Sequence, residues 1–249
     1  WAPMVCPASC IIRYKSVFVV LFTLPMLIPS ISHGMGLVLL FGDNGLITNL
    51  LHLNIGLYGC KGIIIGSVLY SFPVAFLMFN DSLQYEDFTV YEAAGVLGLS
   101  NWNQFTAITL PNMRRTIVSA VLAVFTMVFT DYGVPLMTGG TAMTLPVYMY
   151  REVIGMMNFS GGAVIGVVLL LPAVAAFLMD LRNSGSASAS GTVTKSFCIP
   201  QNPRRDALVY LCFVLVLVLL CLPIVAFVCL SFVRQYPIDM SFSLNSLRK

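Results

Sequence analysis

Few residues of this sequence belong to types that could perform covalent or metal chemistry. His33 and His52, its two histidines, are far apart, and neither has a group of carboxylates or cysteines beside it. The seven cysteines form no C-x-x-C pair, so neither a zinc site nor a disulfide framework is indicated. Nucleophile-elbow and phosphate-binding loop motifs are also lacking. We therefore predict that the chain is not an enzyme, carries no metal and binds no cofactor of its own.

Asp131 is the one carboxylate placed well inside an apolar run. An ionisable group in such a place is costly and by default marks a substrate or ion path. Counted from Arg114 at about 1.5 Å per residue, Asp131 lies roughly 25 Å along a helix, near its outer boundary. We take Asp131, with Tyr132 beside it, as a candidate substrate-path or outer-gate residue. The alternative is an interfacial aspartate just before a helix break at Gly133 and Pro135.

The composition indicates which elements must position these residues. Hydrophobic residues make up 58% of the 249 and charged residues only 9%, against about 25% charged in a soluble domain. A soluble protein of this size could not bury so much apolar surface, so we predict an all-α membrane protein. The net charge of +3 is too small to indicate nucleic acid as a partner.

A membrane helix needs about 20 largely apolar residues. Five full spans are predicted, and their approximate ranges are 16–40, 57–80, 114–135, 161–180 and 207–231. Residues 1–12 would be a sixth span, cut short at the N-terminus. Prolines inside the spans, namely Pro25, Pro29, Pro73 and Pro223, are expected to kink them where neighbouring helices accommodate the lost donors.

Polar residues divide the predicted spans into two unequal parts. Residues 183–194 are small and polar, the composition of a flexible linker, although an ordinary cytoplasmic loop is the alternative. A new apolar span then starts after Arg204, Arg205 and Asp206. We predict a first membrane unit over 1–182, a cytoplasmic linker over 183–203, and the first span and outer loop of a second unit over 204–249. Because the chain starts at Trp1 without a signal-peptide layout, we expect it to be a piece of a longer protein.

The loop between the second and third spans is expected to be cytoplasmic, since eight of the 13 lysines and arginines then lie inside. A helix-forming run starts there at Tyr91, and the small side chains of Ala93 and Ala94 leave a shallow, smooth face. Glu92 places a carboxylate near the expected helix start, where the helix dipole favours negative charge. Gly98 can adopt a left-handed conformation, so the helix is expected to end there.

A second short helix is expected to follow that turn. Ser100 or Asn101 can cap it, and it would run through Ile108. Pro111 then suits the first turn of the next span, where a missing backbone donor costs little. The product would be a helix-turn-helix outside the bilayer, attached rigidly to a membrane helix.

The spacing of seven residues within 85–111 follows the pattern E-A-A-x3-G-x9-I-x-L-P. These residues are Glu92, Ala93, Ala94, Gly98, Ile108, Leu110 and Pro111. The pattern resembles the EAA loop of ABC-type importer permeases, a family that works with a periplasmic binding protein. An amphipathic helix lying on lipid headgroups is the alternative, but it leaves the spacing unexplained.

The resemblance implies the fold of a type I ABC importer transmembrane domain in the inner membrane of a bacterial cell. It implies that the seven residues dock on a cytoplasmic ATP-hydrolysing subunit, which would bind the ATP and magnesium. It also implies a periplasmic substrate-binding protein and a second permease unit, either on the same chain or in a dimer. The membrane lipid completes the expected partners.

Two further stretches, 24–47 and 129–140, are similar to permeases for iron(III), polyamines and 2-aminoethylphosphonate. The resemblance favours 2-aminoethylphosphonate or iron(III) over polyamines as the substrate. A secondary transporter is the rival function, but it would need coupling-ion sites near the bilayer midplane, and the intramembrane charge is almost confined to Asp131. A membrane-embedded enzyme is a further rival, which the lack of a catalytic cluster disfavours.

Overall fold

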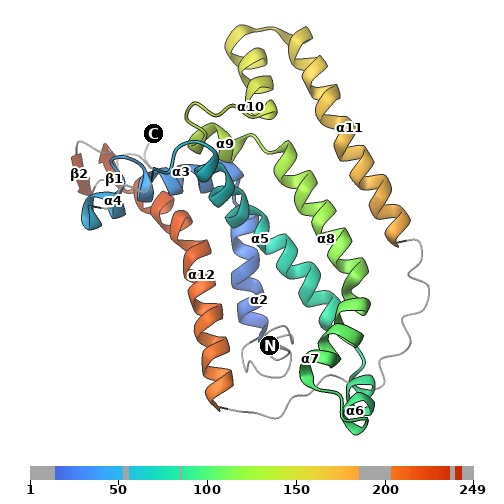
Figure 1. Ribbon diagram of the computed structural model, residues 1–249. Coiled ribbons are helices and arrows are strands. Elements are labelled where there is room, and N and C mark those ends of the chain that lie inside the picture. The colour runs from blue at the N-terminus through green and yellow to red at the C-terminus, as the bar shows by residue number, and fades with distance from the viewer. Residues whose placement is uncertain (1–14, 53–55, 85, 185–202, 236–238, 243–249) are drawn as a thin grey trace.

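The computed structural model describes residues 15–52, 56–84, 86–184, 203–235 and 239–242. The predicted short span at 1–12 and most of the predicted linker lie outside the described residues. Helices make up nearly all of the described chain, and the longest of them run side by side (Figure 1).

Within the described ranges, four helices are long and apolar enough to cross a membrane. They are α5 (Cys60–Gln84), the 30-residue helix Asn101–Thr130 that ends in α8 (Leu110–Thr130), α11 (Phe159–Ser184) and α12 (Pro203–Ser231). Prolines at 73, 172 and 223 lie inside these helices without ending them, as neighbouring helices in a membrane allow. Three predicted spans, 57–80, 161–180 and 207–231, are thereby confirmed.

The predicted end of one span is wrong. The span expected at 114–135 ends at Thr130, because Asp131 takes an extended conformation with φ −74° and ψ 130°. α11 continues to Ser184 and α12 starts at Pro203, and the residues of the predicted linker between them lie outside the described ranges.

The span predicted at 16–40 is broken rather than continuous. It consists of α2 (Lys15–Thr23), a 3₁₀ turn (Leu24–Leu27) and α3 (Ser30–Phe41), and it continues through α4 (Leu46–Leu51). The two halves meet at an angle of 94°. Pro25 and Pro29 each remove a backbone donor. The residue ahead of Pro29 is also forced into extended backbone, with φ −98° and ψ 135°.

α3 is the most deeply buried of the helices near this break. Leu37, Leu39 and Leu40 are almost fully shielded, and α3 packs against α5, α9 (Gly133–Thr138) and α12. The contact with α12 is very close, because a Cβ on Gly36 would lie 2.0 Å from the carbonyl oxygen of Pro223. Small residues of this kind let membrane helices approach each other closely.

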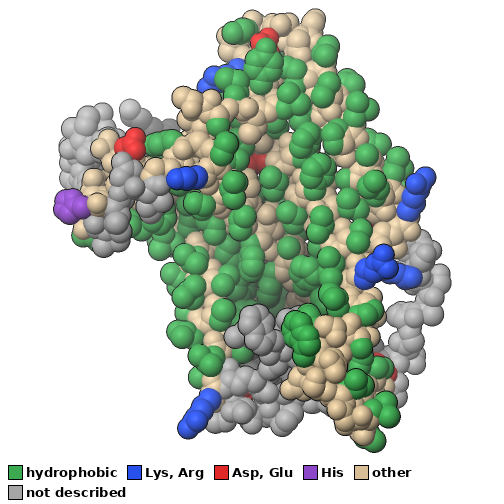
Figure 2. Space-filling view, in the orientation of Figure 1, with side chains coloured by type: hydrophobic (Ala, Val, Ile, Leu, Met, Phe, Trp, Pro, Cys, Tyr) green, Lys and Arg blue, Asp and Glu red, His purple; other side chains and the backbone are tan. Residues whose placement is uncertain are grey.

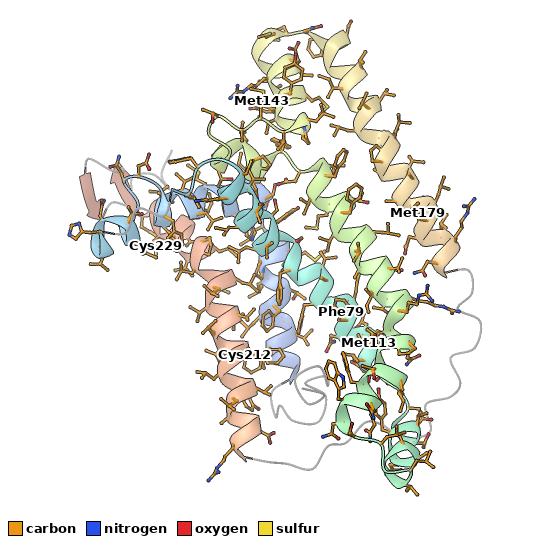
Figure 3. All side chains as sticks on the ribbon, in the orientation of Figure 1. Phe79, Met113, Met143, Met179, Cys212 and Cys229 are labelled. Carbon is orange, nitrogen blue, oxygen red and sulfur yellow. The ribbon has the colours of Figure 1, made fainter. Side chains whose placement is uncertain are left out.

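The long helices separate two groups of short ones. α6 (Phe88–Val96) and α7 (Asn101–Gln104) lie at one end, whereas α9 and α10 (Leu145–Tyr150) lie at the other (Figure 1). α5 packs against α8, and α8 packs against α11. Figure 3 shows Phe79 of α5 and Met113 of α8 toward the end that carries α6 and α7.

Hydrophobic side chains cover the visible face of the long helices, and charged ones are sparse (Figure 2). On α11, Val164, Leu171 and Phe177 each keep more than half of their surface exposed. Such an apolar exterior is expected where lipid is the solvent.

Beyond α12, β1 (Val233–Gln235) pairs antiparallel with β2 (Asp239–Phe242). This small two-stranded sheet is an addition to the predicted all-α fold. It lies in the stretch that the sequence assigns to an outer loop.

Candidate functional site

The segment with the seven-residue pattern starts with α6, one helix turn earlier than expected. Asp87 caps the helix by accepting a hydrogen bond from the backbone N–H of Thr89 at 3.1 Å. Because α6 starts at Phe88, Glu92 is its fifth residue and lies outside the first turn. The expected interaction of Glu92 with the helix dipole is therefore wrong, and its carboxylate is exposed instead.

The end of α6 is a complete glycine cap. The backbone N–H of Leu99 donates to the carbonyl of Ala94 at 3.1 Å, and that of Gly98 donates to the carbonyl of Gly95 at 3.0 Å. Gly98 has φ +73°, the left-handed conformation that this cap requires. The predicted conformation of Gly98 is confirmed.

The second helix is not separate from the membrane span. Ser100 caps α7 by accepting a hydrogen bond from the backbone N–H of Asn103 at 3.3 Å, which confirms one of the two predicted caps. A π turn (Phe105–Thr109) then joins α7 to α8 without a break. The prediction of a short helix ending at Ile108 is wrong in this respect. Pro111 lies in the first turn of α8, as predicted.

The outer face of the turn is more apolar than the pattern alone indicates. Val96 and Leu97 expose 89% and 78% of their surface, and Trp102 across the turn exposes 60%. Ala93 is also exposed, but Ala94 is buried at 4%, so the expected smooth face formed by both alanines is wrong. We call Val96, Leu97 and Trp102 the apolar tip. Apolar residues directly before the capping glycine were the available sequence signal for it.

The remaining members of the pattern lie on the helix that leads into the membrane. Ile108 is half-buried, and Leu110 and Pro111 are exposed. The pattern therefore combines an exposed turn with the base of a membrane span, instead of forming one contiguous patch.

A buried carboxylate behind the tip was missed by the sequence analysis. Glu86 is only 6% exposed and lies between α5 and α6. Its oxygens accept hydrogen bonds from the hydroxyl of Tyr91 at 2.7 Å and from Nδ2 of Asn112 at 3.0 Å. The Tyr91 hydroxyl also lies 2.8 Å from the hydroxyl of Thr109, which is 7% exposed. Four residues from α6, the π turn, α8 and the α5–α6 connection thus form one network, here called the Glu86 network.

Two further polar links join the membrane helices near the same end. The hydroxyl of Thr116 on α8 donates to that of Ser82 on α5 at 2.9 Å. Asn183 of α11 donates from Nδ2 to the carbonyl of Arg115 and to the hydroxyl of Ser119, both at 2.9 Å. α5, α8 and α11 are therefore connected by hydrogen bonds as well as by packing.

Asp131 lies at the opposite end of α8 and is held by three donors. Its Oδ1 accepts from the hydroxyl of Ser30 at 2.5 Å and from the backbone N–H of Gly133 at 3.2 Å. Its Oδ2 accepts from the backbone N–H of Val134 at 3.1 Å. Asp131 therefore caps α9 and ties it to the start of α3. This geometry matches the alternative interpretation, an aspartate at a helix break, and the path role stays a prediction.

The aromatic and histidine neighbours of Asp131 lie in different surroundings. Tyr132 is 43% exposed, and its ring stacks on that of Tyr150 with a centroid separation of 5.4 Å. His33 is 1% exposed, and its ring lies edge-on to Tyr70 at 5.6 Å. His52 is exposed, so the two histidines do not come together.

Residues 12–184 match the family described as the binding-protein-dependent transport system inner membrane component. The match spans well over half of the chain, including the seven-residue pattern and Asp131. This chain belongs to that family. It is a multi-pass inner-membrane protein, and the type I importer fold implied by the sequence resemblance is confirmed.

Several permeases are similar to this chain, with about one residue in four identical. A putative ferric transport system permease protein FbpB 1 of Haemophilus influenzae is 26% identical over 181 residues, which cover 70% of this chain and 29% of the relative. A thiamine transport system permease protein ThiP of Salmonella typhimurium is 24% identical over 226 residues, which cover 87% and 42%. A molybdenum transport system permease protein ModB of Haemophilus influenzae is 28% identical over 143 residues, which cover 55% and 62%. The chain thus spans less than two thirds of each relative.

Proposed function

We propose that this permease is the membrane-spanning part of an ATP-driven importer and that residues 85–111 dock on a cytoplasmic ATP-binding subunit. The apolar tip is the observation that carries the proposal. Val96, Leu97 and Trp102 are exposed at the end of the molecule that carries α6 and α7. Exposed apolar and aromatic side chains of this kind are typical of a protein-binding surface.

The connection of this tip to the membrane supports the same proposal. α7, the π turn and α8 form one 30-residue helix that carries Trp102, so a displacement of this part of the tip is also a displacement of a span. The ATP and magnesium belong to the partner subunit in this proposal, and this chain contributes only the docking surface and the path. The substrate would arrive from a periplasmic binding protein.

Copurification tests the proposal directly. The whole permease, expressed with its neighbouring ATP-binding subunit, should retain that subunit through affinity purification. Replacing Leu97 and Trp102 by serine should lower the retained amount more than tenfold, since buried anchors at an interface each contribute about 2 kcal/mol or more. Val164→Ser on the lipid-facing side of α11 is the matched control and should retain the subunit. Unchanged retention in the tip variants would refute the docking role. Uptake that persists without any ATP-binding subunit and follows a proton gradient would refute the proposal in favour of a secondary transporter.

For the substrate we propose iron(III), with 2-aminoethylphosphonate as the alternative. Two of the relatives are named as ferric transport permeases, and they match 70% and 75% of this chain. Relatives named for molybdenum, thiamine and sulfate have similar identities, so the test must include those substrates and polyamines. Calorimetric titration of the partner binding protein with each compound decides the matter, because tight binding of one alone identifies the cargo.

We also retain the proposal that α12 opens a second permease unit. Its position in the sequence, beyond the end of the family match at residue 184, supports it. A whole protein with a second EAA-type pattern after residue 249 would agree with this arrangement.

A further inference from the structure

The Glu86 network lies between the proposed docking surface and the membrane. α6 is joined to α7 by only a short turn, residues 97–100, in which Gly98 has φ +73°. Among the described residues, apart from its two chain neighbours, no atom lies within 4 Å of the position that a Cβ on Gly98 would occupy. The turn by itself therefore provides little lateral support for α6.

Support for α6 comes from its inner side. The Tyr91 hydroxyl contacts the Thr109 hydroxyl at 2.8 Å, and Thr109 is the last residue of the π turn that leads into α8. The same hydroxyl donates to Glu86 at 2.7 Å, and the other Glu86 oxygen accepts from Asn112 in the first turn of α8 at 3.0 Å. α6 is thus connected to the base of the span by two routes, one directly from Tyr91 to Thr109 and one through the Glu86 carboxylate to Asn112.

Burial makes these bonds difficult to replace. Glu86 and Thr109 are 6% and 7% exposed, so water has little access to them. A hydrogen bond to a charged group is stronger than a neutral one, and a buried partner left without it loses more than the bond itself. Water therefore cannot easily replace the hydrogen bonds of this network, whereas it can replace those of a contact on the surface.

We propose that Glu86 is a positioning residue that fixes α6 to the Asn101–Thr130 helix, so that force applied at the apolar tip moves the span instead of bending the turn. This inference rests on the proposed function, since it assumes a partner that pushes on the tip. Glu86 itself is only 6% exposed, so the docking surface is formed by other residues of 85–111. Glu86 acts through Tyr91, Thr109 and Asn112.

The first experiment measures the position of α6 without any partner. Hydrogen–deuterium exchange of amides 88–97 is followed in the whole permease in nanodiscs. Glu86→Ala and Tyr91→Phe should each increase exchange in α6 about tenfold or more, because both remove the bond between Tyr91 and the buried carboxylate, and Tyr91→Phe also removes the contact with Thr109. Glu86→Gln should restore near-normal exchange, because its amide can still accept from Asn112 and donate to Tyr91. Thr116→Val, which breaks only the link to Ser82, should leave α6 unchanged.

The second experiment measures transmission in the assembled transporter. ATP hydrolysis by the reconstituted complex is compared with and without its binding protein. The Tyr91→Phe variant should keep the ATP-binding subunit bound, but the stimulation of ATP hydrolysis by the binding protein should fall about tenfold. Glu86→Gln should keep most of this stimulation. Tyr91→Phe removes one hydroxyl, so it also covers the case in which Glu86→Ala fails to fold.

The outcomes separate the two proposals. Unchanged exchange in α6 for both Glu86→Ala and Tyr91→Phe overturns the positioning role, whatever the partner does. Increased exchange with unchanged stimulation overturns the transmission role. If the wild-type permease retains no ATP-binding subunit, the proposed function fails, whereas the exchange result still reports on the network.

Discussion

The contact between α3 and α12 gives the sharpest structural prediction. A Cβ on Gly36 would lie 2.0 Å from the carbonyl oxygen of Pro223 and 2.6 Å from its carbonyl carbon. Ordinary van der Waals contact starts at 3.4 Å, so Gly36→Ala requires the two backbones to separate by about 3.4 − 2.0 = 1.4 Å. Both partners are backbone atoms on helices, so no side-chain rotation can relieve the clash. We expect a destabilisation of about 1–3 kcal/mol, the usual cost of overpacking.

The measurement is the thermal stability of the whole permease in detergent, followed by size-exclusion chromatography after heating. A protein of this size loses about 2–4 °C of Tm per kcal/mol. The matched control is Gly166→Ala on α11, where the nearest atom would be the Met149 sulfur at an ordinary 3.7 Å. There, alanine should stabilise the helix by up to about 1 kcal/mol. If Gly36→Ala were as stable as wild type or as Gly166→Ala, the close packing of α12 on α3 would be refuted.

Three further outcomes are expected from the described geometry. Asp131→Ala should lower the free energy of unfolding by about 1–2 kcal/mol through the lost helix cap, measured by the same heating assay; an unchanged Tm would contradict the capping role. Gly98→Ala should cost about 1–2 kcal/mol and raise amide exchange at the end of α6, because its φ is +73°. Gly95 also lies in open space but is helical, so Gly95→Ala should instead stabilise α6 by up to about 1 kcal/mol and lower its amide exchange. Equal effects of the two alanine substitutions would show that the left-handed conformation of Gly98 is not the cause of its effect.

The continuous apolar runs were the part of the fold that the sequence predicts well. Spans near 57–80, 161–180 and 207–231 follow from length and hydrophobicity, since the bilayer thickness sets both. The break after α2, in contrast, could not be predicted from length and hydrophobicity. Prolines 25, 29, 73, 172 and 223 all fall in predicted spans, and only the first two accompany a bend of 94°. A proline removes a donor everywhere, but the surrounding packing decides whether the helix ends, and a single sequence does not contain that packing.

The candidate site divides along the same line. The left-handed Gly98 and the Ser100 cap depend on neighbours within a few residues, and both were predictable. The Glu86 network joins positions 18 and 26 residues apart in sequence, Tyr91 to Thr109 and Glu86 to Asn112. A glutamate just after an apolar span reads as a solvated loop residue unless the fold that buries it is known. Glu92 was misplaced for a smaller reason, the earlier helix start set by Asp87.

The two polar clusters on the Asn101–Thr130 helix have a joint consequence. At about 1.5 Å per residue, the 30 residues extend roughly 45 Å. Thr109 and Asn112 connect its base to α6, and Asp131 at its far end connects to α9 and to Ser30 of α3. A helix held at both ends and packed on α5 and α11 transmits a displacement along its length better than one that is free to bend. In the proposed importer, motion at the apolar tip would therefore reach the junction of α3, α8 and α9. Asp131 would then have a structural role in the moving part of the protein, whether or not it contacts the substrate.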